Sequence, residues 1–338
     1  MADAGYRITV QDGAKLSDEE IALDNLLFNT LELELWPQDP VTPEADAIAE
    51  HRAVPARVQQ TAVRVWAPDG SLAGSLDLGI DPEKTDNPDV LGFGMTVHHA
   101  HRRRGIATGL LAHVVAFARA NERDRLVFST RAPVPAGARF AASLGAVAKS
   151  MSHTNHLPTA EVDRELMEAW VAEGPMRAEG YELLTWDGAV PEEHLGDFVD
   201  LMLVMNDAPR DDLEVNDFTL TPAEWREAEA RSDAVGCERW MLVARRIKDG
   251  ALGGFHRMAW VPALPNAVFV ADTGVRPEHR GRALGKWLKA AMTLRVLDER
   301  PDVTDIRTDN ADSNDAMLGI NEQMGYRQLL GATTWEMS

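Results

Sequence analysis

The positions of the apolar side chains divide the chain into short strands and amphipathic helices. In the first half, alternation of apolar and polar residues predicts strands over residues 6–10, 58–66, 71–78, 90–97, 125–130 and 147–153. Apolar residues at helical spacing predict helices after Ser17 and over residues 104–121 and 135–144. The resulting order is strand, helix, hairpin, strand, helix, strand, short helix and closing strand.

The second half repeats this order after a helix predicted over residues 159–173. Its strands are predicted over residues 181–186, 240–247, 253–261, 267–275, 305–308 and 327–335, and its helices over 192–204, 221–231, 283–298 and 314–324. A period of about 165 residues is too long for a solenoid and predicts two tandem copies of one α/β domain. We place the first domain at residues 1–157, a linker helix at 158–179 and the second domain at 180–338.

Each half contains a basic turn that joins a strand to a helix. Arg102 follows Val97 by the same number of residues as Arg280 follows Val275, and both turns contain small residues. The N–H groups of a first helical turn have no intrahelical acceptor, and the helix dipole favours negative charge there. The two turns therefore predict two anion sites. Neither copy has the Gly-Lys-Ser/Thr ending of a P-loop or the Gly-x-Gly-x-x-Gly of a dinucleotide-binding turn.

Composition narrows the class of protein. The 338 residues carry a formal net charge of −20, which argues against bulk binding of nucleic acid or of a membrane surface. We interpret this charge mainly as a contribution to solubility. The single Cys237 excludes an internal disulfide and suits a reducing compartment. Because neither a long apolar span nor a signal-peptide pattern is present, we expect a cytoplasmic protein.

The first basic turn resembles the signature of a known superfamily. Arg102-x-x-Gly105-x-Ala107 is similar to the Arg/Gln-x-x-Gly-x-Gly/Ala motif of the GCN5-related N-acetyltransferases (GNAT). The second turn, Arg280 to Gly285, resembles the same motif but has Ala283 where the family has its first Gly.

The resemblance extends over both halves of the chain. Residues 140–145 and 314–326 resemble the second motif of the family, a short helix that ends before a Gly. The tandem arrangement is similar to two-domain actinobacterial members, mycothiol synthase among them. The resemblance implies two tandem GNAT domains, each a mixed, mostly antiparallel sheet flanked by helices, and acetyl-CoA as the cofactor.

The resemblance also implies which residues bind coenzyme A. The turn N–H groups would hold the pyrophosphate, and the last residues of the preceding strand would pair with the pantetheine and the acetyl carbonyl. In the first copy these residues are Met95, Thr96, Val97, Arg102, Arg103, Arg104, Gly105, Ile106, Ala107, Thr108 and Gly109. In the second copy they are Thr273, Gly274, Val275, Arg280, Gly281, Arg282, Ala283, Leu284, Gly285, Lys286, Asn310 and Asn314.

The chemistry of acetyl transfer needs a neutral amine, a polarised thioester carbonyl and a proton for the departing thiolate. The family often places a Tyr acid four residues before the Gly of its second motif, but Ala141 and Asn321 occupy these positions here. Asn321 is our candidate for a hydrogen bond to the sulfur. Asp272 is our candidate base, and a structural carboxylate on a central strand is the equally weighted alternative.

The two halves differ in the roles predicted for their other carboxylates. Asp207, Asp211 and Glu214 lie in an acidic loop where the family has its substrate lid, and we predict that they bind the substrate; a solvated loop is the alternative. In the first half, Glu34 and its neighbours Asp24 and Glu32 are expected on a solvated helix face. His98, His99 and His101 are too closely spaced for a metal site, so no metal is predicted.

The leading hypothesis is an acetyl-CoA-dependent N-acetyltransferase that acts on a primary amine of a small, by preference cationic, molecule. The second domain is predicted to do the chemistry, and the first to bind the cofactor with little or no turnover. A non-catalytic acyl-CoA sensor or interaction module is the alternative, because the Tyr acid is missing from both copies. A protein-lysine acetyltransferase is a third hypothesis without a sequence signal of its own. We expect a monomer or a homodimer.

Overall fold

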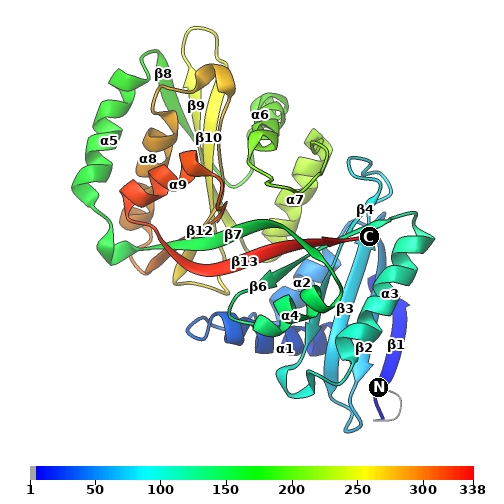
Figure 1. The fold of residues 1–338 in the computed structure, drawn as a ribbon. Coiled ribbons are helices and arrows are strands. Elements are labelled where there is room, and N and C mark those ends of the chain that lie inside the picture. The colour runs from blue at the N-terminus through cyan, green and yellow to red at the C-terminus, as the bar shows by residue number, and fades with distance from the viewer. Residues whose placement is uncertain (1–4) are drawn as a thin grey trace. The chain divides into compact units, whose positions relative to one another are not determined.

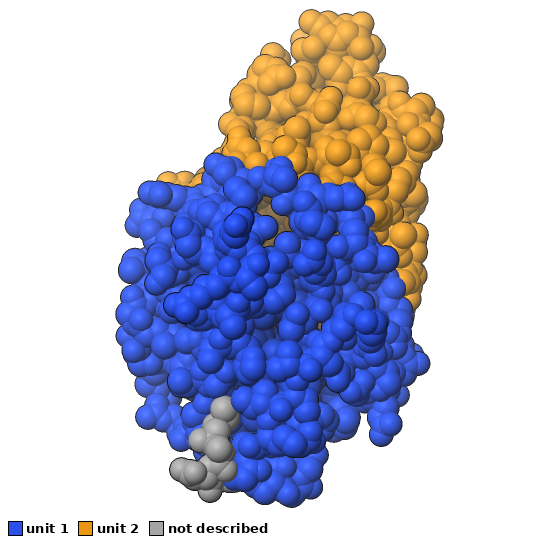
Figure 2. All heavy atoms as spheres, turned by 90° about the vertical axis from the view of Figure 1, so that its right-hand side faces the viewer, with its two compact units in different colours: residues 1–151, 212–216, 332–338 blue, residues 152–211, 217–331 orange. Residues whose placement is uncertain are grey.

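The computed structural model describes residues 5–338 (Figure 1). The chain forms two compact units, which Figure 2 distinguishes by colour. Unit 1 comprises residues 1–151, 212–216 and 332–338, and unit 2 comprises residues 152–211 and 217–331. These bounds differ from the predicted division at 157 and 180. Residues 152–157 of the predicted first domain belong to unit 2, and residues 212–216 and 332–338 of the predicted second domain belong to unit 1.

Unit 1 contains most of the elements predicted for the first half. Its strands are β1 (Arg7–Asp12), β2 (Gln59–Trp66), β3 (Leu72–Ile80), β4 (Val90–Gly92), β5 (Gly94–Val97) and β6 (Arg125–Arg131). Its helices are α1 (Asp18–Leu35), α2 (Glu44–Arg52), α3 (Ile106–Ala120) and α4 (Pro135–Ser143). Ser17 begins α1 with a reciprocal capping box to Glu20, which explains why the start of this helix was predictable.

The four strands β1, β2, β3 and β5 form an antiparallel sheet in that order. Alternating residues of β2 face two different cores. Val63 packs with Leu110 and Val114 of α3, whereas Ala62 packs with Ile21 of α1. Unit 1 therefore has α3 on one face of this sheet and α1 with α2 on the other.

The strand predicted over residues 90–97 is divided in two, and its halves belong to different sheets. β4 pairs in parallel with β6, Leu91 facing Leu126, and β5 pairs with β3, Met95 facing Leu76. At the junction, the Phe93 N–H donates to the Val127 carbonyl at 3.0 Å. Because the chain changes partner at Phe93, β5 and β6 separate, and the space between them is not closed by backbone hydrogen bonds.

Unit 2 repeats the same architecture. Its strands are β8 (Tyr181–Asp187), β9 (Glu238–Arg246), β10 (Leu252–Trp260), β11 (Ala267–Val275) and β12 (Asp305–Ala311). Its helices are α5 (Arg164–Arg177), α6 (Leu195–Met202), α7 (Pro222–Ala234), α8 (Leu284–Glu299) and α9 (Asp315–Met324). Phe255 of β10 packs toward α6 and α7, and Met258 packs toward α8, so helices again cover both faces.

β11 separates from β12 as β5 separates from β6. β11 pairs with β12 in parallel only from Ala267 to Val270. One residue further on, the register with β10 shifts between Arg257 and Met258, so Ala271 is an extra residue in β11. The end of β11, from Asp272 to Val275, therefore keeps β10 as its neighbour and leaves the other side open.

The last strand of each half crosses into the other unit. β7 (Val147–Pro158) pairs with β12 through residues 152–158, and β13 (Arg327–Met337) pairs with β6 through residues 332–337. The prediction that residues 147–153 and 327–335 close their own domains holds for residues 147–151 and 327–331 and fails for residues 152–153 and 332–335, which belong to the other unit. Strand partners are chosen by long-range packing rather than by local sequence, and a period-two pattern does not specify them.

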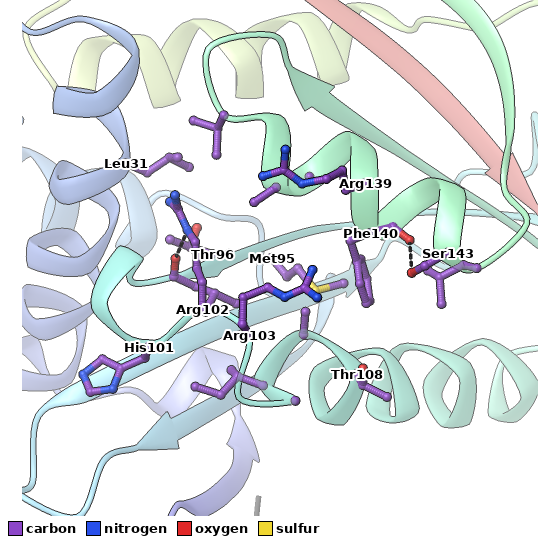
Figure 3. A pocket seen from close by; sticks show the side chains of 18 residues that line it. Leu31, Met95, Thr96, His101, Arg102, Arg103, Thr108, Arg139, Phe140 and Ser143 are labelled. Carbon is purple, nitrogen blue, oxygen red and sulfur yellow. Dashed lines mark hydrogen bonds between the residues drawn. The ribbon is translucent and has the colours of Figure 1, made fainter.

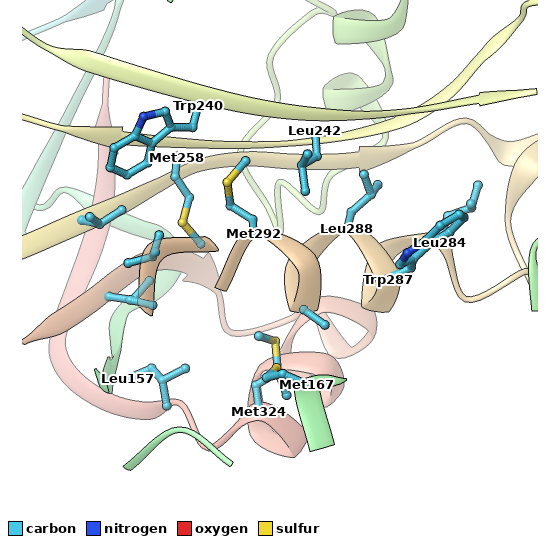
Figure 4. Close-up of a cluster of buried hydrophobic side chains, with 14 of the residues drawn as sticks. Leu157, Met167, Trp240, Leu242, Met258, Leu284, Trp287, Leu288, Met292 and Met324 are labelled. Carbon is cyan, nitrogen blue, oxygen red and sulfur yellow. The ribbon is translucent and has the colours of Figure 1, made fainter. Parts of the chain in front are cut away.

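The predicted linker helix over residues 158–179 is an integral part of unit 2. As α5 it contributes Met167 to the core that contains Trp287, Leu288 and Met292 of α8 (Figure 4). A Cβ at Gly174 would lie 2.4 Å from the indole of Trp287. This close approach explains why α5 has a glycine in its last turns and shows that the helix is not a free connector.

Candidate functional site

Each basic turn holds two residues in the left-handed conformation before its helix begins. In unit 1 these are Arg103 and Gly105, with φ of 64° and 79°, and α3 begins at Ile106. In unit 2 they are Gly281 and Ala283, with φ of 76° and 58°. Ala283, which departs from the family motif in sequence, thus adopts the same backbone shape as Gly105, at a steric cost that the surrounding fold must offset.

The helix starts leave backbone donors at both turns. In α3, the first N–H that donates to a carbonyl four residues earlier is that of Gly109, which bonds to Gly105 at 3.0 Å. In α8, the first is that of Trp287, which bonds to the Ala283 carbonyl at 3.0 Å. The N–H groups that precede them have no intrahelical acceptor. With the helix dipole, they form a cradle suited to a phosphate or pyrophosphate.

The first Arg of each motif braces its turn. Arg102 donates through Nε to the Val97 carbonyl at 3.2 Å and through Nη1 and Nη2 to the Glu34 carboxylate at 2.8 and 2.6 Å. The expectation that Glu34 lies on a solvated face is therefore wrong. Arg280 likewise donates to Val275 at 2.9 Å and to Asp207 at 2.6 Å.

A Tyr–His pair supports each turn, and we did not predict it. The hydroxyl of Tyr6, just before β1, lies 2.9 Å from Nδ1 of His101, and the hydroxyl of Tyr181 lies 2.5 Å from Nδ1 of His279. Burial is the main cause that lowers the pKa of His279. The signal was present in the sequence, because a Tyr begins the first strand and a His precedes the motif Arg in both copies.

A pocket of about 580 Å³ lies in unit 1 where β5 leaves β6 (Figure 3). Figure 3 shows Arg139 and Phe140 of α4 across from Arg103 and Thr108. The pocket is lined by Leu31, Met95, Thr96, Val97, His101, Arg102, Arg103, Gly105, Ile106, Ala107, Thr108, Val134, Ala136, Gly137, Arg139, Phe140, Ser143 and Leu144. Nine predicted cofactor residues are in this set, so they surround one cavity.

The equivalent pocket of unit 2 measures about 630 Å³ and lies beside the free end of β11. It is lined by Arg177, Val204, Met205, Asp207, Ala208, Pro209, Thr273, Gly274, Val275, His279, Arg280, Gly281, Ala283, Leu284, Gly285, Lys286, Ser313, Asn314, Asp315, Ala316, Met317 and Ile320. Both volumes are typical of small-molecule sites.

Four predicted cofactor residues lie outside these linings. Arg104 donates to the Tyr6 hydroxyl at 3.0 Å, and Arg282 lies over the Tyr181 ring at 5.9 Å. Gly109 makes the helical bond described above, and Asn310 accepts a hydrogen bond from Asn321. Their roles in cofactor binding stay predictions.

The two predicted catalytic residues are engaged elsewhere in unit 2. Asp272 forms an ion pair with Arg257 at 2.6 Å, and the Arg257 guanidinium lies 4.8 Å from the Trp225 ring centroid. Asn321 is 2% exposed and donates through Nδ2 to Asn310 Oδ1 at 2.8 Å. Neither residue lines the pocket of unit 2. Each has a protein side chain as its partner instead, Arg257 for Asp272 and Asn310 for Asn321.

The three predicted substrate residues are not brought together. Asp207 lines the pocket of unit 2 and pairs with Arg280. The Asp211 carboxylate accepts a hydrogen bond from the hydroxyl of Ser313, which is at the pocket. Glu214 belongs to unit 1, where its carbonyl accepts a hydrogen bond from Arg125 at 2.6 Å.

The following two statements concern residues 5–338. No group of three or more His, Cys, Asp or Glu side chains in that range is placed to hold a metal ion. None of the helices described is long and apolar enough to cross a bilayer.

Comparison with known proteins agrees with this architecture. Residues 25–146 match the model of the acetyltransferase (GNAT) family. A tandem GNAT protein from the clavulanic acid biosynthesis pathway superposes with a TM-score of 0.79 at 24% identity over 98% of both chains. A GCN5-related N-acetyltransferase from Sphaerobacter thermophilus superposes with a TM-score of 0.65 at 15% identity, over 98% of this chain and 95% of the other. No curated protein matches the sequence significantly. The narrower resemblance to mycothiol synthase stays a prediction.

Proposed function

We propose that this chain transfers an acetyl group from acetyl-CoA to a primary amine of a small molecule. The proposal is supported by its likeness in fold to a tandem GNAT protein and by the match of residues 25–146 to the acetyltransferase (GNAT) family model. One observation carries the proposal. In both units, a strand that has separated from its neighbour ends at a left-handed basic turn and a helix N-terminus, and a pocket lies at that junction.

The fit of acetyl-CoA to these sites rests on the donors and the space present. The unpaired N–H groups of the first turns of α3 and α8 suit its pyrophosphate. At Gly285, an added Cβ would meet only Ile320, at an ordinary contact distance of 3.5 Å, so the cradle has room for a ligand close to the backbone. When bound, acetyl-CoA supplies an acetyl group activated as a thioester.

The chain would contribute orientation and charge stabilisation. The free side of β11 from Thr273 to Val275 offers backbone groups that polarise a carbonyl, a role that preorganised donors fill at low reorganisation cost. The lining of the unit 2 pocket contains the carboxylates Asp207 and Asp315 together with Arg177, Arg280 and Lys286. Asp207 is paired with Arg280, so Asp315 is the carboxylate that would attract a cationic amine.

Charge supports the predicted division of labour between the domains. The lining of the unit 1 pocket includes Arg102, Arg103 and Arg139, and no carboxylate among the described residues. Such a pocket suits the phosphates of coenzyme A and disfavours a cationic acceptor. We therefore propose that unit 2 accommodates the amine and that unit 1 binds the cofactor with little or no turnover.

The alternative is a non-catalytic acyl-CoA sensor. It is supported by Ala141 and Asn321 at the positions of the usual Tyr acid and by the Arg257 partner of Asp272. Thiol release from acetyl-CoA, measured with spermidine, glucosamine and kanamycin as acceptors, separates the two. Turnover with any amine supports the enzyme, whereas tight calorimetric binding of acetyl-CoA without thiol release favours the sensor.

A further inference from the structure

Equivalent positions in the two units can be identified from shared landmarks. The register of the strands equates Leu76 and Met95 of unit 1 with His256 and Thr273 of unit 2. Within each pair, the two residues lie opposite each other on neighbouring strands. Met95 and Thr273 each precede the last Val of their strand by two positions. They therefore occupy the same place behind the two pockets.

Two more landmarks extend the comparison into the helices. Counting from the first Arg of each cradle equates Leu111 of α3 with Lys289 of α8, and Val115 with Thr293. The Gly that ends α4 and the Gly that ends α9 are followed by equivalent residues, because the N–H of Ala146 bonds back to Ala141 and that of Tyr326 bonds back to Asn321.

The equivalent positions differ in one consistent respect. Those of unit 1 are apolar: Leu76, Met95, Leu111, Val115, Ala141 and Ala146. Those of unit 2 are polar: His256, Thr273, Lys289, Thr293, Asn321 and Tyr326. Five of these six polar residues are buried, with His256 and Thr293 fully inaccessible and Lys289 1% exposed.

Much of this polar cluster lacks hydrogen-bond partners within the described residues. His256 Nδ1 and Thr273 Oγ1 are 2.7 Å apart. By contrast, His256 Nε2, Lys289 Nζ, Thr293 Oγ1 and the Tyr326 hydroxyl are buried and have no hydrogen-bond partner among residues 5–338. The Lys289 amine lies 5.3 Å from the centroid of the Tyr326 ring.

Such a cluster works against folding. A buried polar group without a partner loses its hydration and gains nothing in return. Unit 1 shows that the same fold closes the same space with apolar side chains. A cost that one copy avoids and the other keeps is expected at a functional site rather than in a neutral core. The cluster has one member at the cavity, since Thr273 lines the pocket of unit 2.

On the basis of the proposed acetyl transfer, we propose that Thr273 is a catalytic residue that carries the proton of the amine to the sulfur of coenzyme A, and that His256 is the positioning residue that aligns its hydroxyl. Thr273 lies three residues beyond Val270, the last residue of β11 that pairs with β12. Its side chain thus stands at the open part of β11, where the missing Tyr acid leaves the thiolate without a proton donor.

The step is balanced without a further reactant. The amine nitrogen attacks the thioester carbon, and a C–N bond forms. As the C–S bond breaks, the sulfur takes the hydroxyl proton of Thr273, and Thr273 Oγ1 recovers a proton from the nitrogen, which becomes the amide. His256 remains neutral throughout and donates from Nδ1 to Thr273 Oγ1, which keeps the hydroxyl proton of Thr273 directed away from His256.

Lys289 acts on this arrangement through its charge. Burial first, and then the charge of Lys289, hold the pKa of His256 well below its usual range. The charge of Lys289 thus helps to keep His256 neutral, the state in which one ring nitrogen is a donor and the other an acceptor. Besides His256 on β10, the amine faces Tyr326 before β13. Burial and Asp305 of β12 raise the pKa of Tyr326.

The test compares variants in a chain whose first cradle is closed by Ala107→Asp, so that binding and turnover report on unit 2. The variants are Thr273→Val, Thr273→Ser, His256→Leu and Lys289→Leu, the last two of which introduce the residue found in unit 1. Met292→Leu, at a buried apolar position of α8, controls for repacking. Each is measured for acetyl-CoA binding by calorimetry, for thermal unfolding, and for thiol release with the three amines above and in buffer alone.

We expect Thr273→Val and His256→Leu to lower kcat by roughly 100-fold, the usual range for loss of a proton-transfer group, with an unchanged Kd for acetyl-CoA. Thr273→Ser should retain most activity. Burial lowers the pKa of Lys289 to about 7, so kcat of the parent protein should decrease above that pH as Lys289 loses its proton. Lys289→Leu should not show this decrease. It should also unfold at an equal or higher temperature.

Two different results would overturn the inference, and only one of them would also overturn the proposed function. Wild-type kcat and pH profile in Thr273→Val and His256→Leu, with turnover present, would reject the proton shuttle and leave acetyl transfer standing. Binding of acetyl-CoA without thiol release in the parent protein would reject the proposed function, and the shuttle with it.

Discussion

The carboxylate of Glu34 holds the guanidinium of Arg102 through two hydrogen bonds, of 2.8 and 2.6 Å, and so ties the end of α1 to the first basic turn. In unit 2, Asp207 of the 3-10 turn at Leu203–Asp207 accepts one hydrogen bond from Arg280, at 2.6 Å. In both units the motif Arg thus supports the shape of the cradle, and the backbone N–H groups remain available to the ligand. The two ion pairs differ in their number of hydrogen bonds and in exposure.

That difference predicts unequal effects on stability. The Arg102 and Glu34 side chains are 23% and 28% exposed, whereas those of Arg280 and Asp207 are 51% and 48% exposed. Glu34→Gln should lower the free energy of unfolding by about 1–3 kcal/mol, because a half-buried guanidinium loses a charged acceptor. Asp207→Asn should change it by about 0–1 kcal/mol. Urea titrations of both variants would check this order, and equal losses would contradict it.

The cradles can be closed one at a time. Ala107 and Gly285 occupy the second positions of α3 and α8, where an Asp suits the helix dipole but repels a pyrophosphate. Ala107→Asp and Gly285→Asp should each reduce the calorimetric stoichiometry from two acetyl-CoA per chain to one without lowering the unfolding temperature. Gly285→Asp, and not Ala107→Asp, should abolish thiol release.

The matched controls are Ala107→Asn and Gly285→Asn, which have nearly the same volume and no charge. They should retain two-site binding if repulsion rather than bulk is responsible. Loss of turnover in Ala107→Asp alone would assign the chemistry to unit 1 and reverse our proposal.

Lys289 makes stability depend on pH. Its pKa is lowered by burial from 10.5 in the unfolded chain to about 7 in the folded protein. Between these values the unfolded state binds the proton and the folded state does not, so stability increases as pH rises and is lost as pH falls toward 7. The slope attributable to this group is at most about 1.4 kcal/mol per pH unit. Chemical denaturation from pH 7 to 10 should show the slope in the parent and its absence in Lys289→Met.

The exchanged strand predicts a long-range effect of a terminal deletion. Residues 332–337 pair with β6, and Glu336 forms an ion pair with Arg125 at 2.6 Å. A chain that ends at Gly331 should therefore lose amide protection in β6 of unit 1, because backbone groups of that strand lose their partners. Hydrogen exchange with mass spectrometry would measure it. Peptides from β12 serve as the control, and unchanged exchange in β6 would exclude the pairing.

Local features of this fold were predictable from the sequence. Ser17 with Glu20, and Thr221 with Glu224, cap their helices through side chains three residues apart, and both capping boxes are present. Gly145 and Gly325 adopt positive φ where the helices end. The two basic turns were recognisable for the same reason, because a strand end, small residues and a helix start lie within a few residues of one another.

Features that depend on distant partners were not predictable. Residues 90–97 form one hydrophobic run, yet they are divided at Phe93 because β3 and β6 compete for its two halves. The roles of Glu34 and Asp272 depended on which cation lies opposite each, Arg102 and Arg257 respectively. The spacing of side chains specifies which of them share one face of a helix or strand. It does not specify which residues from elsewhere in the chain pack against that face.

The sequence by itself determined the duplication and the two basic turns at the starts of α3 and α8, because these follow from local geometry. Only the tertiary structure decided that the last strands exchange units and that Lys289 is buried. It also brought His256 beside Thr273, which identifies unit 2 as the copy with a polar core. Burial and hydrogen-bond partners arise from packing between segments far apart in the chain, and one-dimensional patterns do not contain that information.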